Sequence, residues 1–342
     1  MARPYFDGQW SMVLSGTIFV TGGAGYVGSH CCKVFSELGW KVVVYDNLSR
    51  GWREFVKWGD LIEGDILDLD ALTSAINSVS PDVVAHFAAF AYIAESMADP
   101  GMYYRNNVQG TLNLLEAMKA NSVSKLIFSS SCATYGISDE VLTESSPQSP
   151  INPYGSSKLM AERIIQDFCE LHDFRSVILR YFNAGGCDPD LEIGERHDPE
   201  PHVIPLAIKG AKEGDFTFTI NGNDFDTRDG TCIRDYVHVC DLARAHGLAA
   251  QHLSDGKSSE VINLSTGGGT SILELVDAVS AVSGVTLPVK YGPRRPGDPP
   301  ALVASNKKAK DVLGWSPEMS DIQTIVKTAW AWFEQDEIGA QP

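Results

Sequence analysis

Positive charge is scarce in this chain, which has 27 lysine and arginine residues against 44 aspartate and glutamate residues in a length of 342. The formal net charge is therefore −17, and no basic stretch could neutralise many phosphates. This balance argues against a generic nucleic-acid binder, and we expect no nucleic-acid partner. Any anionic small molecule must instead meet a few locally placed positive groups.

Cysteines and long apolar runs are also scarce. The seven cysteines form no CxxC pair and follow no regular spacing, so we expect no disulfide framework, and a reducing cytoplasm fits best. Apolar runs such as 42–45 have strand length, whereas a membrane span needs roughly 20 residues. Residues 1–16 contain no apolar signal core and are treated as an N-terminal extension. No metal-binding residues are assigned, and no metal or membrane partner is expected.

Short β-branched runs alternate with helical stretches up to about residue 181, which is typical of an α/β fold with a Rossmann-like, doubly wound parallel sheet. Strands are expected at 18–21, 41–45, 61–65, 82–87, 125–129 and 176–181. Helices are expected at 27–38, 69–77, 107–120 and 154–171, where apolar residues recur at three- and four-residue spacing. The later chain is richer in Gly, Pro, Asp and Asn, which indicates a smaller C-terminal α/β lobe. The domain that contains the parallel sheet is expected to span 17–183, and the C-terminal lobe is expected to span 184–342. Part of 235–266 is expected to return to the sheet domain.

Three glycines, Gly22, Gly25 and Gly28, follow the first expected strand and open the first expected helix. This spacing permits a tight turn, close approach of a pyrophosphate to the backbone, and close packing of helix on strand. Asp46 ends the next strand, where a carboxylate accepts hydrogen bonds from the adenosine ribose and repels a 2′-phosphate. The pattern predicts a site for NAD rather than NADP. Asp65, after the third strand, is either an adenine contact or a strand-end turn carboxylate.

Tyr154 and Lys158 lie four residues apart and share one face of an expected helix. A nearby ammonium favours the ionised phenol, and lowering a tyrosine pKa from about 10 to about 7 needs roughly 4 kcal/mol. One charge about 4 Å away supplies about that much at an effective dielectric near 20. Ser131 ends a buried strand and is expected to bind the substrate oxygen that is oxidised. Each residue alone has a structural explanation, but together with the glycines they indicate a nicotinamide-dependent enzyme.

These residues stand within a longer series of ordered motifs, through which the chain strongly resembles the extended short-chain dehydrogenase/reductase family and, within it, the UDP-glucose 4-epimerases. The resemblance covers about residues 17–332. The motifs that carry it are Thr21–His30, Asp46–Leu48, His86–Ala89, Glu95–Ser96, Tyr103–Asn107, Ser129–Ser131, Pro153–Tyr154 with Lys158, Arg180–Asn183, Asp229–Thr231, Arg234–His238 and Arg294–Asp298.

The resemblance implies an isomerase that inverts C4 of a UDP-hexose, UDP-glucose or UDP-galactose, through a transient 4-keto sugar with tightly bound NAD. It implies three catalytic residues: Ser131, Tyr154 and Lys158. The residues it places at the cofactor are Gly22, Gly25, Tyr26, Val27, Gly28, Asp46, Asn47, Asp65, Ile66, Phe87, Ala88, Ala89, Asn107, Ser129, Tyr154, Lys158 and Tyr181. Those it places at the UDP-sugar are Ser131, Tyr154, Asn183, His202, Arg234, Arg295 and Asp298. It also implies a homodimer formed through the helices at 107–120 and 154–171.

Several positions depart from the better-known epimerases and leave alternatives open. Ala91 stands where many relatives carry a lysine, and Leu302 stands where side-chain size is thought to limit bulky N-acetyl sugars. A UDP-arabinose/UDP-xylose or UDP-N-acetylglucosamine 4-epimerase is therefore an alternative. A sugar-nucleotide 4,6-dehydratase is less favoured, because Cys132–Ala133 replace its Asp-Glu pair. A non-catalytic NAD-binding regulator is also less favoured, since such proteins commonly lack the tyrosine or the lysine.

Overall fold

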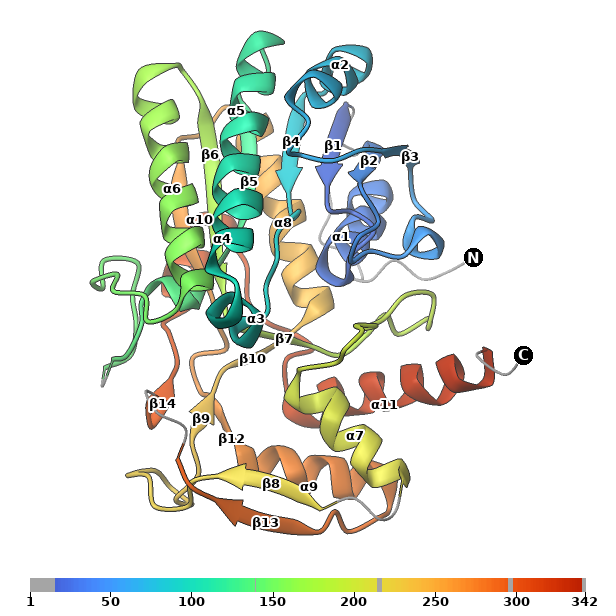
Figure 1. Ribbon diagram of the computed structural model, residues 1–342, viewed down its shortest axis with the longest axis vertical. Helices are drawn as coiled ribbons and strands as arrows, with labels where there is room; N and C mark the ends of the chain where they lie inside the picture. Colours follow the sequence, from blue (N-terminus) through green and yellow to red (C-terminus); the bar gives the residue numbers. More distant parts are fainter. Residues whose placement is uncertain (1–15, 139, 214–216, 295–297, 340–342) are drawn as a thin grey trace.

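The larger part of the molecule is one seven-stranded sheet in which every strand pair is parallel (Figure 1). The computed structural model describes residues 16–138, 140–213, 217–294 and 298–339. In spatial order the strands are β11 (Glu260–Leu264), β6 (Arg175–Tyr181), β5 (Lys125–Ser131), β4 (Val83–His86), β1 (Thr17–Thr21), β2 (Lys41–Asp46) and β3 (Asp60–Glu63). The strand order reverses between β1 and β4, which is where sheets of this kind bind ligands beyond the carboxyl ends of their strands.

Helices cover both faces of this sheet, each over its own apolar layer. One face carries α1 (Tyr26–Glu37) and α8 (Val239–Ser254), with α10 (Lys307–Leu313) beside them. The other carries α2 (Leu69–Val79), α5 (Gly110–Ala120) and α6 (Pro153–Leu171). The sheet is therefore buried on both sides, which explains its nearly continuous Val, Ile and Leu runs. The expected Rossmann-like fold class is confirmed.

The six expected strands and four expected helices all form, but the start of the third helix differs from the prediction. A π-helical segment, η2 (Tyr104–Gln109), precedes α5, so residues 107–109 are not α-helical. Such wide turns commonly accompany functional side chains. Short helical turns complete this half of the molecule: η1 (Arg53–Phe55), α3 (Ile93–Ala98), α4 (Pro100–Tyr103) and η3 (Cys132–Thr134).

A smaller lobe lies below the sheet in Figure 1 around a separate apolar core. Its helices are α7 (Val203–Glu213), α9 (Ile272–Ser283) and α11 (Ile322–Gly339). Its short strands are β7 (Asn183–Gly185), β8 (Phe218–Asn221), β9 (Ile233–Arg234), β10 (Tyr236–His238), β12 (Thr270–Ser271), β13 (Val289–Gly292) and β14 (Ala301–Leu302). Between these lobe elements the chain returns twice to the large sheet, first as α8 and β11 and then as α10. Among the described residues, no helix is both long and apolar enough to cross a membrane.

Candidate active site

Two connected cavities lie at the point where the strand order reverses. The larger, about 460 Å³, is walled by the sheet on one side and the lobe on the other. The smaller, about 80 Å³, lies over β1 and β2. Both are lined by Gly22 and Gly25, so the glycine turn after β1 joins them. One elongated ligand can therefore run from the ends of β1 and β2 into the cleft between sheet and lobe.

The glycine turn leaves no room for side chains at two of its three positions. A Cβ on Gly22 would lie 2.4 Å from the Ala88 backbone nitrogen, and one on Gly28 would lie 2.2 Å from the Gly22 carbonyl oxygen. Gly22 also has φ of +75°, which favours glycine. A Cβ on Gly25 would meet only the Gly22 oxygen, at 3.4 Å, and would otherwise point into open space.

The N-terminus of α1 faces this open space. Its N-cap, Gly25, supplies no side-chain hydrogen bond to the first-turn N–H groups, which remain available to an anion. A glycine cradle at an uncapped helix N-terminus fits the pyrophosphate of NAD. Of the residues predicted at the cofactor, Tyr26, Val27 and Gly28 line the larger cavity beside this turn.

Asp46 lies at the end of β2, in the smaller cavity, with its carboxylate held by the backbone. Its Oδ2 accepts from the Ala24 N–H at 3.0 Å, and its Oδ1 accepts from the Leu48 N–H at 2.9 Å. Burial raises the pKa of this carboxyl, and these two hydrogen bonds oppose the rise. The other predicted cofactor residues that line the smaller cavity are Asn47, Ile66, Ala88 and Ala89. Asp65 lies beside them and accepts from the Asn47 side-chain amide at 2.9 Å.

Tyr154 and Ser131 meet in the larger cavity, whereas Lys158 is buried behind it. The Lys158 ammonium nitrogen donates to the Ser129 carbonyl at 2.8 Å. It also lies 4.9 Å from the centre of the Phe128 ring. Asn152 caps α6 by accepting from the Gly155 N–H, which fixes the first turn that carries Tyr154.

The ionisation of this pair differs from the sequence-based expectation. Burial raises the pKa of Tyr154 to about 12, and a hydrogen bond with Ser131 only partly opposes it. Burial likewise lowers the pKa of Lys158 to about 7, against the attraction of Glu162. In the protein alone the pKa of the phenol therefore rises, because desolvation outweighs the hydrogen bond with Ser131. A further positive charge in the cleft is needed to produce a phenolate.

The remaining cofactor predictions fall on the wall behind this pair. Phe87 and Tyr181 line the larger cavity, and the Tyr181 hydroxyl lies 2.6 Å from the Ser129 hydroxyl. Asn107 lies in the π-helical segment and is buried. Its side chain accepts from the Phe90 N–H at 2.9 Å and donates to the Ser157 hydroxyl at 3.0 Å, so it ties η2 to α6.

Most residues predicted to bind UDP-sugar line the lobe side of the larger cavity: Asn183, His202, Arg234 and Asp298. Two of them pair with each other, since the Arg234 guanidinium donates to Asp298 Oδ1 at 2.6 Å. Arg295 lies outside the described residues. Leu302 also lines this wall, so a branched aliphatic side chain borders the cavity here.

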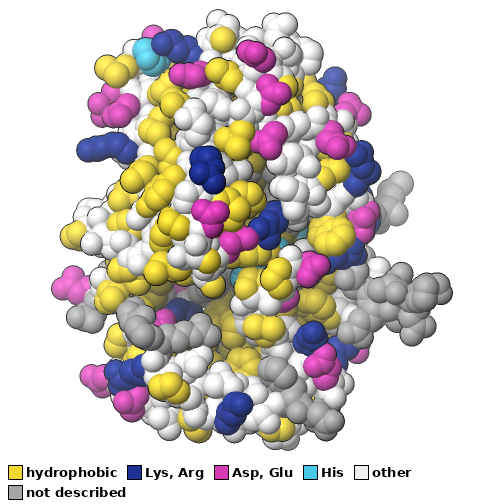
Figure 2. All heavy atoms as spheres, viewed as in Figure 1, with side chains coloured by type: hydrophobic (Ala, Val, Ile, Leu, Met, Phe, Trp, Pro, Cys, Tyr) yellow, Lys and Arg dark blue, Asp and Glu magenta, His cyan; other side chains and the backbone are white. Residues whose placement is uncertain are grey.

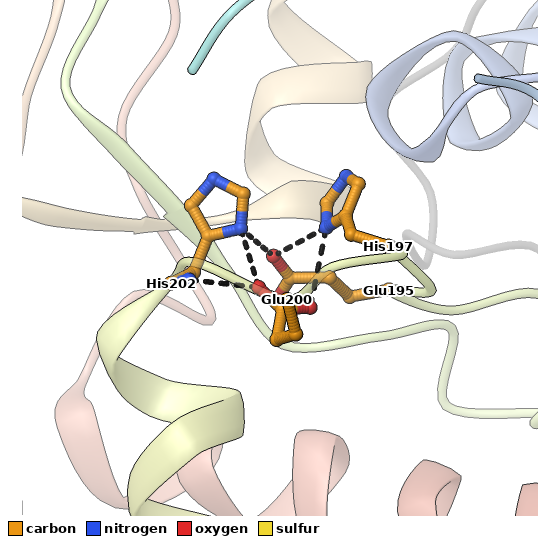
Figure 3. Close-up of side chains that lie close together, drawn as sticks. All are labelled: Glu195, His197, Glu200 and His202. Carbon is orange, nitrogen blue, oxygen red and sulfur yellow. Dashed lines mark hydrogen bonds and ion pairs between the residues drawn. The ribbon is translucent and has the colours of Figure 1, made fainter. Parts of the chain in front are cut away.

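A cluster that the sequence analysis missed lies on the same wall: Glu195, His197 and Glu200, together with His202 (Figure 3). Each carboxylate pairs with both histidines. Burial alone would lower the pKa of His202 by disfavouring its charged form. Hydrogen bonds to the two glutamates nevertheless raise that pKa to about 10. For the same reason the pKa of Glu200 falls to about 2. The spacing Glu-x-His-x-x-Glu-x-His was the signal in the sequence that could have identified it.

Comparison with known proteins gives one consistent picture. Residues 18–265 match the NAD dependent epimerase/dehydratase family. A UDP-glucose 4-epimerase of Rhizobium leguminosarum bv. trifolii is 48% identical over 92% of this chain and 97% of that relative. The crystal structure of UDP-glucose 4-epimerase from Brucella ovis in complex with NAD superposes with a TM-score of 0.90 and 48% identity, over 93% of this chain and 98% of that one. The Bifidobacterium longum enzyme in complex with NAD+ and UDP gives a TM-score of 0.88 at 35% identity, over 94% of this chain and 99% of that one.

Proposed function

The chain belongs to the NAD dependent epimerase/dehydratase family, and on that premise we propose that it is an isomerase interconverting UDP-glucose and UDP-galactose. The reaction inverts C4 through a transient 4-keto sugar, with NAD tightly bound. The observation that carries the proposal is that Tyr154 and Ser131 line one cleft together with the glycine turn. A proton acceptor and a redox cofactor can therefore reach the same sugar carbon.

The residues that hold NAD in this proposal are the glycine turn with the α1 N-terminus at the pyrophosphate, and Asp46 at the adenosine ribose. When bound, NAD supplies a reversible acceptor for the hydrogen on C4 and a positive charge beside the phenol. Tyr154 accepts the proton of the sugar 4-hydroxyl, while Ser131 orients that oxygen by hydrogen bonding. Lys158, held on the Ser129 carbonyl, adds positive charge when protonated. Tyr154 returns the proton when the carbonyl is reduced.

Inversion requires the 4-keto sugar to present its opposite face before it is reduced. The nucleotide must therefore be held firmly while the sugar is held loosely. Arg234, Asn183 and Asp298 are assigned to the UDP portion, together with Arg295, because arginine forks match phosphate oxygens. In this proposal the nicotinamide and the sugar share a cleft of about 460 Å³, in which the sugar turns about its bond to the diphosphate. The cycle leaves no net oxidation.

Two features favour this reaction over its relatives on the same scaffold. Cys132 and Ala133 border the cleft directly after Ser131, where a dehydratase needs an acid and a base. Leu302 borders the cleft where an N-acetyl group would add bulk, which favours an unsubstituted hexose. A panel of UDP-sugars that includes UDP-xylose and UDP-N-acetylglucosamine ranks these substrates directly.

We assign the protein to the cytoplasm and to a homodimer. All seven cysteines are free thiols, and none of them makes a disulfide, which suits a reducing compartment. The dimer is assigned to the outer faces of α5 and α6, where Met160 is 47% exposed. Apolar side chains are numerous over this part of the surface in Figure 2.

The proposal is tested with UDP-galactose as substrate and a coupled assay for UDP-glucose. Tyr154→Phe should lower turnover by about 10²- to 10⁴-fold, because the proton acceptor is lost, while UDP affinity stays within about twofold. Tyr291→Phe is the matched control, since it removes a hydroxyl from a half-exposed tyrosine of the lobe and should leave turnover unchanged. Near-normal turnover of Tyr154→Phe, or NADH accumulating in solution, would contradict the proposal.

A further inference from the structure

Four potential metal donors converge at the wall of the larger cavity, on the segment that leads into α7. The His202 Nδ1 atom lies 3.0 Å from Glu195 Oε1 and 2.7 Å from Glu200 Oε1. The His197 Nδ1 atom lies 3.4 Å from Glu195 Oε1 and 3.3 Å from Glu200 Oε2. Each histidine nitrogen thus lies next to both carboxylates, with Glu200 presenting a different oxygen to each histidine, and Figure 3 shows the four side chains converging in one small ring.

These spacings suit a four-coordinate ion. A tetrahedral zinc site with metal–ligand bonds of about 2.0–2.2 Å has donor atoms about 3.3–3.6 Å apart. The four neighbouring distances run from 2.7 to 3.4 Å, so the shortest must lengthen by about 0.6 Å to reach this value. All four donor atoms also lie within 4.8 Å of one another. An ion can enter the centre once the His202 nitrogen, which makes the two closest pairs, moves away from the carboxylates.

The charge and type of the donors point to the same class of ion. Two carboxylates balance the charge of a divalent cation, and two imidazoles favour first-row transition metals over Mg²⁺ or Ca²⁺. Glu195 is buried, with only 3% of its surface exposed, so its carboxylate requires a partner cation. Among the described residues, Glu195 pairs with His197 and His202 of the ring.

The backbone around the ring is held from outside, so the donors are preorganised. The indole N–H of Trp332 donates to the Glu195 carbonyl at 3.0 Å. The indole N–H of Trp52 donates to the Arg196 carbonyl, also at 3.0 Å. One tryptophan comes from the lobe helix α11 and the other from a loop next to the sheet, which fixes the segment from both sides.

A second cluster of acidic residues differs from this ring because a lysine ammonium lies among its carboxylates. Asp188, Asp190 and Glu192 also converge, but the Lys33 ammonium lies 2.8 to 3.1 Å from all three carboxylates and occupies their centre. That cluster already contains its cation. In the ring of Glu195, His197, Glu200 and His202, the ion pairs join the two carboxylates to the two histidines themselves.

We propose that Glu195, His197, Glu200 and His202 form a binding site for one divalent first-row transition metal ion of the zinc type. The sequence analysis assigned no metal, and the site goes beyond the proposed epimerase reaction. Three of the four residues line the larger cavity, so the ion sits in the cavity wall. Its role there is to fix the segment before α7, next to the Tyr92 ring that lies edge-on to both histidines.

The test uses the full chain after treatment with a chelator, buffered above neutrality so that the histidines can release their protons. Zn²⁺ is titrated by calorimetry, and Co²⁺ is added as a visible-absorbing probe of geometry. Wild type should bind one Zn²⁺ per chain and give the strong visible bands of tetrahedral Co²⁺ without a thiolate charge-transfer band. His197→Gln and Glu200→Gln should each weaken Zn²⁺ binding at least about 100-fold, since even outer partners of a metal site contribute 10- to 100-fold.

Asp190→Asn is the matched control, because it alters the other acidic cluster and should leave Zn²⁺ affinity unchanged. Circular dichroism checks that each variant is folded. If His197→Gln is not folded, the nearly isosteric Glu200→Gln still provides the test. Absence of stoichiometric binding, equal binding by all variants, or a thiolate band would overturn the proposal and leave a carboxylate–imidazolium cluster without metal. The experiment measures bound metal, so its outcome does not depend on whether the protein has epimerase activity.

Discussion

At the scale of single residues, the centre of the cleft shows how desolvation competes with charge. Lys158 is 5% exposed and carries its ammonium against a carbonyl and an aromatic ring rather than against a carboxylate. Its pKa therefore falls to about 7, and that of Tyr154 rises to about 12. Since the pKa of the phenol lies far above neutral pH, Tyr154 needs additional positive charge to act as a base, and NAD⁺ would supply that charge in the proposed reaction. The proton acceptor is then active only when the cofactor is present.

The lysine pKa predicts a particular pH dependence of stability. In the unfolded chain Lys158 stays protonated up to its ordinary pKa near 10.5, whereas in the folded chain it loses its proton above about 7. Between these values the unfolded state binds more protons, so folding stability contributed at this site rises with pH. Below about pH 7 Lys158 is protonated in both the folded and the unfolded state. The folded state then bears the full cost of burying this charge, on the order of 5 kcal/mol.

This is checked by denaturant unfolding of the cofactor-free protein and of Lys158→Met across that pH range. The free energy of unfolding of wild type, minus that of the variant, should increase from about pH 7 to about pH 10 and be flat below. Taking the difference cancels the titration of other groups. A difference that does not change with pH would mean that Lys158 keeps an ordinary pKa in the fold.

At the scale of elements, the turn between β1 and α1 places the helix N-terminus in the cleft. Gly28 brings α1 against the Gly22 carbonyl, while Gly25 lies on the open side with φ of −83° and ψ of 175°, which any residue can adopt. Gly28 and Gly25 thus have different structural roles, in that order. One is needed for packing of the helix on the turn, and the other leaves space for a ligand.

The two glycines should therefore respond differently to alanine. Gly28→Ala puts a Cβ 2.2 Å from a backbone oxygen and should destabilise the fold by about 1–3 kcal/mol, as overpacking does. Gly25→Ala should leave stability within about 1 kcal/mol of wild type and lower NAD affinity at least about 10-fold, because its methyl group enters the cofactor cavity. Thermal unfolding and fluorescence titration with NADH measure both effects. If Gly25→Ala keeps full affinity, the cofactor does not lie over this turn.

At the scale of the whole molecule, α5 and α6 cover the apolar layer on one face of the sheet, and exposed methionines lie on α6 and on the neighbouring α3. Met160 on α6 is 47% exposed, and Met97 on the neighbouring α3 is 62% exposed. Helix faces of this kind are typical of an interface in which two copies present the same patch to each other. Light scattering should therefore give the mass of a dimer.

Met160→Lys should shift this dimer toward monomer at micromolar concentration, because two like charges would meet near the symmetry axis. Val285→Lys is the matched control, since Val285 is 44% exposed on the lobe, away from α6. Equal masses for wild type and Met160→Lys, or a monomeric wild type, would place the interface elsewhere or remove it. The measurement needs no substrate and is independent of the catalytic assignments.

The sequence by itself determined the parallel sheet and the position of its ligand site. Buried strands need continuous β-branched runs, and a helix that opens on a glycine turn needs glycines at fixed spacing, so both leave local patterns such as Val42–Val44 and Gly22–Gly28. Ser131 and Tyr154 could be paired from their positions at a strand end and a helix start. Local patterns of this kind do not depend on the rest of the chain.

Only the tertiary structure decided how charges and donors meet across the cleft. The pKa values of Lys158 and Tyr154 depend on burial by several elements at once, which no spacing encodes. The ring of Glu195, His197, Glu200 and His202 closes because the two tryptophans Trp52 and Trp332, far apart in sequence, hold one irregular segment in place. Segments without regular structure carry no periodicity, so the convergence of their side chains follows from packing alone.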